Sequence, residues 1–261
     1  MTDTADRPEA PLPVLILIHG ATLNGHMWDP VRRHLDPRFP QVIAPDLPGH
    51  GSRRDEVYTL QGAVDTVVAA ARSANGAPVV LSGDSLGGYS CLAAAASVPA
   101  AQLKGLVLGG CTANLIGFKA MLPFRARVLM FKTLMALSNE DKLMAKSLLK
   151  VRKSLLDAQV LPEDIDALFK AGMSLTAYIQ AVKALTGVDF RSKLAAIPQP
   201  VLLVNGTKDH VMMAQEPSFL AAAQHGSRHV FENCEHGVSL QRSAGFAALI
   251  NEFVGRINRA V

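Results

Sequence analysis

Residues 78–97, PVVLSGDSLGGYSCLAAAAS, decide the fold of this chain of 261 residues. The run 78–82 is apolar and rich in β-branched residues, as buried strands are, and the Ala-rich run 88–97 is typical of a helix. Between them, residues 83–87 (GDSLG) match the pattern G-x-S-x-G. On a sharp turn from strand to helix, the two glycines leave room for neighbouring segments, and the turn pushes the Ser85 hydroxyl outward. A glycine-rich turn without a function could carry the same letters, but the strand before it and the helix after it favour an exposed nucleophile.

Strand-like runs alternate with helical stretches along most of the chain. This alternation is typical of βαβ units around a parallel sheet. The sequence therefore predicts an α/β fold with a mostly parallel sheet covered by helices on both faces. The candidate strands are 14–18, 41–45, 78–82, 104–109, 200–205 and 228–232, and the candidate helices are 26–36, 60–75, 86–97 and 240–258.

The alternation stops between residues 114 and 195, which contain no convincing strand and many Met and Leu residues. We expect a helical cap at 114–195, inserted into a core domain formed by 1–113 and 196–261. Such an insertion would lie over the carboxyl ends of the strands, where open α/β sheets bind ligands. Its Met and Leu side chains could simply form a core, and any that face the cleft would favour a flexible apolar substrate.

A serine is a poor nucleophile unless a base lies within hydrogen-bond reach. His236, in the sequence NCEHG at 233–237, directly follows the last candidate strand. The carboxyl ends of parallel strands share one edge of a sheet, so His236 is expected near Ser85. A solvated loop histidine is the alternative interpretation. His225 and His229 lie before or at the start of the same strand and are expected at the opposite edge.

The base in turn needs an acceptor that fixes its tautomer. Asp209, in GTKD at 206–209, follows the preceding strand, although aspartate is also common in ordinary turns. No carboxylate follows the strand 104–109. A further loop after the first strand, HGAT at 19–22, could aim a backbone N–H into the cleft.

These motifs resemble the α/β-hydrolase superfamily, in its lidded branch of esterases, lipases, thioesterases and carbon–carbon bond hydrolases. The resemblance implies Ser85, Asp209 and His236 as a catalytic triad, and the N–H groups of Ala21 and Leu86 as oxyanion donors, with Thr22 as the rival of Ala21. It also implies that no cofactor and no metal is needed. The matching stretches run through the whole chain in the family's order: 19–20, 46–52 (DLPGHGS), 83–88, 206–209 and 235–237.

The expected function is hydrolysis of a carboxylic ester or thioester of a small to medium apolar substrate through an acyl-enzyme. Cleavage of a carbon–carbon bond or a lyase reaction on the same triad remains an alternative, as does a ligand-binding receptor of low turnover.

One departure from the family is Asp84, where many relatives carry His. Ser85 holds the apex of the turn, so Asp84 is not the expected nucleophile. Its charge could instead raise the pKa of His236.

Charge and composition indicate a globular protein with a basic middle segment. The chain holds 26 Lys and Arg against 22 Asp and Glu, of which residues 114–197 hold 13 and 7. Lys142, Lys146, Lys150 and Lys153 share one helix face, which is either solvated or suited to an anionic carrier or membrane surface. No nucleic-acid module is visible. The acidic first ten residues and three scattered cysteines favour a cytoplasmic location without a membrane-spanning segment.

Overall fold

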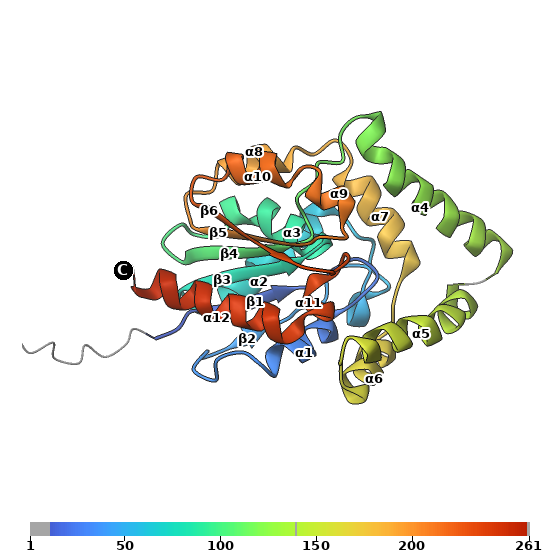
Figure 1. Cartoon of the computed structure of the whole chain (residues 1–261), viewed down its shortest axis with the longest axis horizontal. Helices are drawn as coiled ribbons and strands as arrows, with labels where there is room; N and C mark the ends of the chain where they lie inside the picture. The colour runs from blue at the N-terminus through green and yellow to red at the C-terminus, as the bar shows by residue number, and fades with distance from the viewer. Residues whose placement is uncertain (1–10, 139, 260–261) are drawn as a thin grey trace, which may run out of the picture.

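The computed structural model of the protein describes residues 11–138 and 140–259, with the side chains of 140, 141 and 144–147 outside the description. Its described strands form one sheet in the order β2-β1-β3-β4-β5-β6, and every pairing between them is parallel (Figure 1). This confirms the predicted parallel α/β sheet. The strands are β1 (Val14–Ile18), β2 (Val42–Ile43), β3 (Val79–Asp84), β4 (Leu103–Gly109), β5 (Val201–Gly206) and β6 (Gly226–Phe231).

Helices cover both faces of the sheet, because side chains alternate along each strand and both sets are apolar. In β1, Val14, Ile16 and Ile18 pack on one face, and Leu15 and Leu17 pack on the other. The first face is covered by α2 (Leu60–Ser73), α3 (Leu86–Ala94), α8 (Phe190–Ala195) and α10 (Glu216–Ala222). The second is covered by the 3-10 helix η1 (Gly25–Trp28) with α1 (Asp29–Arg32), α11 (Val238–Gln241) and α12 (Ser243–Arg259).

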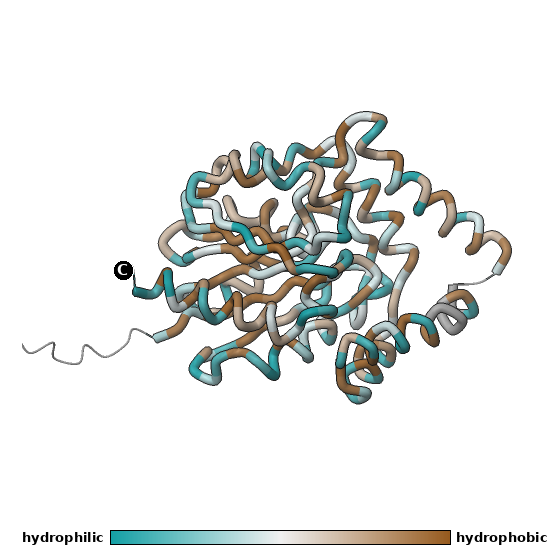
Figure 2. The backbone as a smooth tube through the Cα atoms, in the orientation of Figure 1, coloured by the Kyte–Doolittle hydropathy of each residue, from teal (hydrophilic) through white to brown (hydrophobic). Residues whose placement is uncertain are grey.

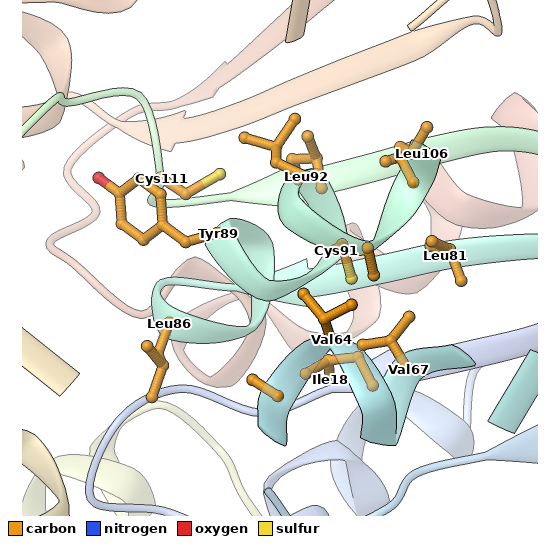
Figure 3. Packing of buried hydrophobic residues seen from close by; sticks show 14 of the residues in the cluster. Ile18, Val64, Val67, Leu81, Leu86, Tyr89, Cys91, Leu92, Leu106 and Cys111 are labelled. Carbon is orange, nitrogen blue, oxygen red and sulfur yellow. The ribbon is translucent and has the colours of Figure 1, made fainter. Parts of the chain in front are cut away.

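Figure 3 shows part of the core on the first face, around α3 and the strands beside it. Ile18 and Leu81, from neighbouring strands, lie close to Val64 and Val67 of α2 and to Cys91 of α3. Burial of each such aliphatic side chain stabilises the fold by about 1.5–3 kcal/mol. This packing fixes α3 against the sheet and so fixes the position of the turn at its amino end.

The predicted elements agree with the structure in position, but their ends are shifted and two of the predicted helices are broken. The predicted strand 41–45 is only the two-residue β2. The predicted helix 26–36 consists of η1 followed by the short α1, in which Pro30 occupies the first turn. The predicted helix 240–258 is interrupted at Arg242, whose φ of −135° is not helical. Local backbone geometry, which the apolar pattern does not encode, causes these differences.

Between β4 and β5 the described chain is helical, as predicted for this segment. It forms α4 (Phe118–Leu137), α5 (Glu140–Asp157), α6 (Pro162–Lys170), α7 (Leu175–Leu185) and α8. Helix α4 packs on α7, α5 packs on α6, and α6 packs on η1. These four helices lie together at one end of the sheet (Figure 1). Helix α8 packs instead on α3 and α10, so it belongs to the layer that covers the sheet.

Helix α4 is apolar on two faces. In Figure 2 it is coloured brown at its hydrophobic residues, with teal residues between them. Met121, Phe124 and Val128 pack toward the core on its inner face. Its outer face exposes Phe118, Leu122, Leu129, Met130, Leu134 and Leu137 to solvent.

On the neighbouring α5, Lys142, Lys150 and Lys153 are exposed, and the side chain of Lys146 lies outside the described residues. Within 11–138 and 140–259, no helix combines the length and apolarity that crossing a bilayer would require.

Candidate active site

The turn between β3 and α3 holds Ser85 in a strained conformation. Ser85 has φ 55° and ψ −115°, a region that side-chain-bearing residues rarely adopt. Its N–H donates to the Gly109 carbonyl at 2.7 Å. A Cβ atom on Gly83 would overlap the backbone of Gly87, and one on Gly87 would overlap the backbone of Ile18. The two glycines are therefore required by close backbone approach, as the sequence pattern predicts.

His236 lies between Ser85 and Asp209 and is hydrogen-bonded to both. Its Nε2 lies 2.8 Å from Ser85 Oγ, and its Nδ1 lies 2.6 Å from Asp209 Oδ2. Asp209 can only accept when ionised, so Nδ1 carries the proton and Nε2 accepts from the Ser85 hydroxyl. The structure thus brings together three side chains that follow β3, β5 and β6.

The loop after β5 brings Asp209 and His236 together. The Lys208 N–H donates to the Cys234 carbonyl at 2.9 Å, which ties the segment after β6 to the segment after β5. A Cβ atom on Gly206 would overlap the Cys234 backbone, so this approach depends on glycine. Asp209 also begins helix α9 (His210–Met213), where its Oδ1 accepts from the Met212 N–H at 3.4 Å.

The two expected oxyanion donors belong to residues that line the same cavity as Ser85. Ala21 and Leu86 both line this cavity, and neither N–H has a hydrogen-bond partner among the described residues. Leu86 is the first residue of α3, where helix N–H groups lack intrahelical partners. The rival donor, Thr22, does not line the cavity, and its carbonyl accepts from the Ser174 N–H at 3.1 Å. The pair Ala21 and Leu86 is therefore available to stabilise a developing negative charge.

A buried histidine fixes the loop that carries Ala21. His19 Nδ1–H donates to the Gly20 carbonyl at 2.8 Å, and its Nε2 accepts from the Leu47 N–H at 2.9 Å. Burial, aided by the neighbouring His50, lowers the pKa of His19 to about 3. His19 is therefore neutral at neutral pH and can serve as donor and acceptor at once. None of His19, His50, His225 and His229 is among the described residues that line the cavity.

The electrostatic environment of His236 favours its protonated form. Burial lowers its pKa, but the hydrogen bond and charge of Asp209, followed by the charge of Asp84, outweigh burial and raise the pKa above 6.5. The positive charge of Arg127 acts in the opposite direction. His236 therefore holds a proton more firmly than a free imidazole does.

Asp84 is a buried carboxylate behind His236, only 1% exposed. Its Oδ2 accepts from the N–H of Ser239 at 3.2 Å and from the Ser239 hydroxyl, and its Oδ1 has no hydrogen-bond partner among the described residues. A Cβ atom on Gly110 would lie 3.2 Å from Asp84 Oδ1 and 3.1 Å from His236 Cε1. The carboxylate and the imidazole therefore both border the position that a side chain on Gly110 would occupy. Asp84 is not the residue that faces the cavity.

A cavity of about 130 Å³ lies above Ser85. Its walls are mostly apolar and come from the loop after β4, from α4 and from α7. Arg127 and Tyr178 also line it, and sequence reasoning missed both because no motif surrounds them. Ser239, the partner of Asp84, was missed for the same reason. The apolar wall residues are Leu115, Pro123, Phe124, Ala181, Val182, Leu185, Val211 and Met212.

Comparisons with known proteins agree with this fold. The family model described as "Alpha/beta hydrolase family" matches residues 15–249. A pimeloyl-acyl-carrier-protein methyl ester esterase from Neisseria meningitidis serogroup C is 30% identical over 91% of this chain and 92% of that protein. One with the same name from Xanthomonas campestris is 27% identical over 94% and 96%. The solved structure of an esterase from Exiguobacterium antarcticum superposes with a TM-score of 0.73 at 19% identity, covering 93% of this chain and 92% of that one.

Proposed function

Since the chain belongs to the alpha/beta hydrolase family, we propose that Ser85, His236 and Asp209 form the catalytic triad of its ester-cleaving reaction. The protein is a hydrolase that acts on ester bonds, as its esterase relatives are named. The observation that carries the residue assignment is the continuous chain of hydrogen bonds from Ser85 through His236 to Asp209, at 2.8 and 2.6 Å. It lies at the base of the cavity above the strained turn.

The first half of the reaction forms an acyl-enzyme. Ser85 Oγ attacks the ester carbonyl carbon while His236 Nε2 takes the hydroxyl proton, and Asp209 stabilises the imidazolium through Nδ1–H. The N–H groups of Ala21 and Leu86 donate to the oxyanion. When the tetrahedral intermediate collapses, the ester C–O bond breaks, and the leaving alkoxide takes the proton from His236. The products are an alcohol and an ester on Ser85.

The second half releases the acid and restores the enzyme. Water enters, His236 removes one of its protons, and the oxygen attacks the acyl carbon. The same two N–H groups hold the second oxyanion. The bond between the acyl carbon and Ser85 Oγ then breaks, and Ser85 recovers the proton from His236. No redox partner is required, because every step moves only protons and acyl groups.

The cavity supports a small to medium apolar substrate. A cavity of about 150 Å³ in another protein holds one benzene molecule, so about 130 Å³ here suits a short acyl or alkyl group. The walls offer aliphatic and aromatic contacts. The curated relatives are named for a methyl ester, which favours a carboxylic ester over a thioester as the bond that is cleaved.

Replacement of the nucleophile tests this function. We expect Ser85→Ala to lower kcat/KM for 4-nitrophenyl acetate and butyrate by about a thousandfold or more, because triad serines contribute at least that much. Ser97→Ala, an exposed serine far from the cavity, is the matched control and should leave both rates unchanged. More than a tenth of the activity remaining in Ser85→Ala would show that another residue is the nucleophile.

The same variants separate the remaining alternatives. A fluorophosphonate probe should label the wild type and not Ser85→Ala. Labelling combined with cleavage of a β-diketone, and with no ester turnover, would assign a carbon–carbon bond hydrolase instead. A single acylation followed by very slow product release would assign a ligand-binding receptor.

A cytoplasmic location forms part of this proposal. Cys91, Cys111 and Cys234 are buried and carry free thiols. Unpaired cysteines are usual in reducing compartments, where disulfides are rare. Fractionation of cells that produce the protein at natural levels tests the location.

A further inference from the structure

Arg127 is an exception among the residues that line the cavity. Of the described lining residues, only Asp209, His236 and Arg127 are charged or readily become charged. Asp209 and His236 are bonded to each other. No described carboxylate forms an ion pair with Arg127, although the chain pairs many of its other arginines with acids. Arg127 is exposed, and a cation that lines an apolar cavity without an acidic partner is available to an anion brought by a ligand.

The neighbours of Arg127 hold it at the cavity. Arg127 lies on α4 and lines the cavity, and Tyr178 lies on α7, which packs against α4. The guanidinium carbon lies 6.0 Å from the centroid of the Tyr178 ring. Arg127 also hydrogen-bonds the Tyr178 side chain. A guanidinium carries five N–H donors, so several of them stay available for a planar acceptor.

The positive charge of Arg127 acts on His236. It is one of the groups that alter the pKa of His236, which it lowers. The opposite end of the site is negative, because Asp209 and Asp84 both lie beside His236. A substrate with one anionic end would therefore be repelled from the triad and attracted to α4. This polarity would orient the ester carbonyl toward Ser85.

We propose that the natural ester carries a carboxylate at the end remote from the reacting carbonyl, and that Arg127 binds this carboxylate. This inference rests on the proposed esterase function and adds the class of substrate. A guanidinium binds both carboxylate and phosphate through two parallel N–H bonds. A carboxylate fits better here because its single charge matches the one permanent cation among the described lining residues, whereas a phosphate carries nearly two negative charges. The small apolar cavity accommodates the short hydrocarbon link between the two ends.

A matched pair of esters tests the proposal. The 4-nitrophenyl monoester of adipic acid carries a terminal carboxylate, and the corresponding ester of adipic acid monoamide is neutral and of equal size. We expect the wild type to prefer the acid by about tenfold in kcat/KM, as for a charged hydrogen bond of moderate strength. In Arg127→Gln the ratio should fall to about one, through a higher KM for the acid, and Arg127→Lys should retain part of it.

Arg125→Gln is the control, because Arg125 is exposed on the same helix and does not line the cavity. It should keep the wild-type ratio of about ten and the activity on both esters. The ratio in the wild type should also fall as salt is added, since an accessible ion pair is screened.

The outcomes separate this inference from the proposed function. Equal rates for the two esters in the wild type would overturn the carboxylate assignment and leave the esterase function intact. Turnover of neither ester, nor of 4-nitrophenyl butyrate, would instead count against the function itself. Stronger competitive inhibition by hexyl phosphate than by adipate, lost in Arg127→Gln, would show that the bound anion is a phosphate and that the carboxylate assignment is wrong.

Discussion

At the scale of single residues, the buried carboxylate Asp84 helps to set the pKa of His236, the proposed base. Asp84 and the imidazole both lie next to Gly110, and the negative charge of Asp84 raises the pKa of His236. The base acts only when it is neutral, so activity should rise with pH through the raised pKa of His236. The acidic limb of the pH–rate profile is therefore the property that reports on Asp84.

We expect Asp84→Asn to move the acidic limb of kcat/KM to lower pH. Removal of a negative charge lowers the pKa of His236, so the neutral base persists into more acidic solution. The profile should be recorded from pH 4 to pH 9 for a short aryl ester, with Asp65→Asn as the control. Asp65 is exposed on α2 and bonds only to Gln61. An unchanged limb in Asp84→Asn would show that this carboxylate serves structure alone.

Sequence reasoning located the residues that sit at strand ends. Ser85, Asp209 and His236 each follow an apolar run, and parallel strands place such positions at one edge. Arg127 and Ser239 follow no such rule. Their approach to the site depends on how a helix and a loop pack, which is a long-range property that no local spacing encodes.

At the scale of elements, α4 shows why a helix can be predicted without its orientation. Its apolar residues surround the whole helix, so periodicity does not distinguish the face toward α7 from the face toward solvent. The amphipathic α2 is different, because its buried residues recur at helical spacing. The sequence consequently predicts that both segments are helical and predicts the inner face only for α2.

The free energy of unfolding distinguishes the outer face of α4 from a buried helix position. Leu137 of α4 is 81% exposed, so Leu137→Gln should change the free energy of unfolding by less than about 0.5 kcal/mol. Leu194 of α8 is fully buried, so Leu194→Ala should cost about 2–5 kcal/mol. Urea denaturation followed by circular dichroism gives both values. A large loss in Leu137→Gln would mean that the outer face of α4 is covered in solution.

At the scale of the whole molecule, a buried carboxylate joins the edge strand to the helix layer. Glu216 of α10 is fully buried and accepts from Arg228 of β6 at 2.7 Å and from Asn205 of β5 at 2.6 Å. A buried charge that loses its cation is costly. The strand order and this connection depend on contacts between residues far apart in the sequence. The sequence therefore predicted the strands but not which of them would lie at the edges.

Arg228→Met should therefore lower the free energy of unfolding by about 2–3 kcal/mol, less than for a fully buried pair because Arg228 is half exposed. The double variant Glu216→Gln with Arg228→Met should recover much of the loss, since no unpaired charge then remains. Thermal and urea unfolding measure both. Equal losses in the single and double variants would show that packing, and not charge, governs this edge.

The order of the strands also has a consequence for synthesis on the ribosome. From β3 onward the sheet grows by one neighbour at a time toward β6, and the base that completes the proposed triad follows that final strand. Ser85 emerges early, without an imidazole beside it. A nascent chain would thus carry an inert hydroxyl until nearly all of the polypeptide has been made, and incomplete translation products would lack hydrolytic activity.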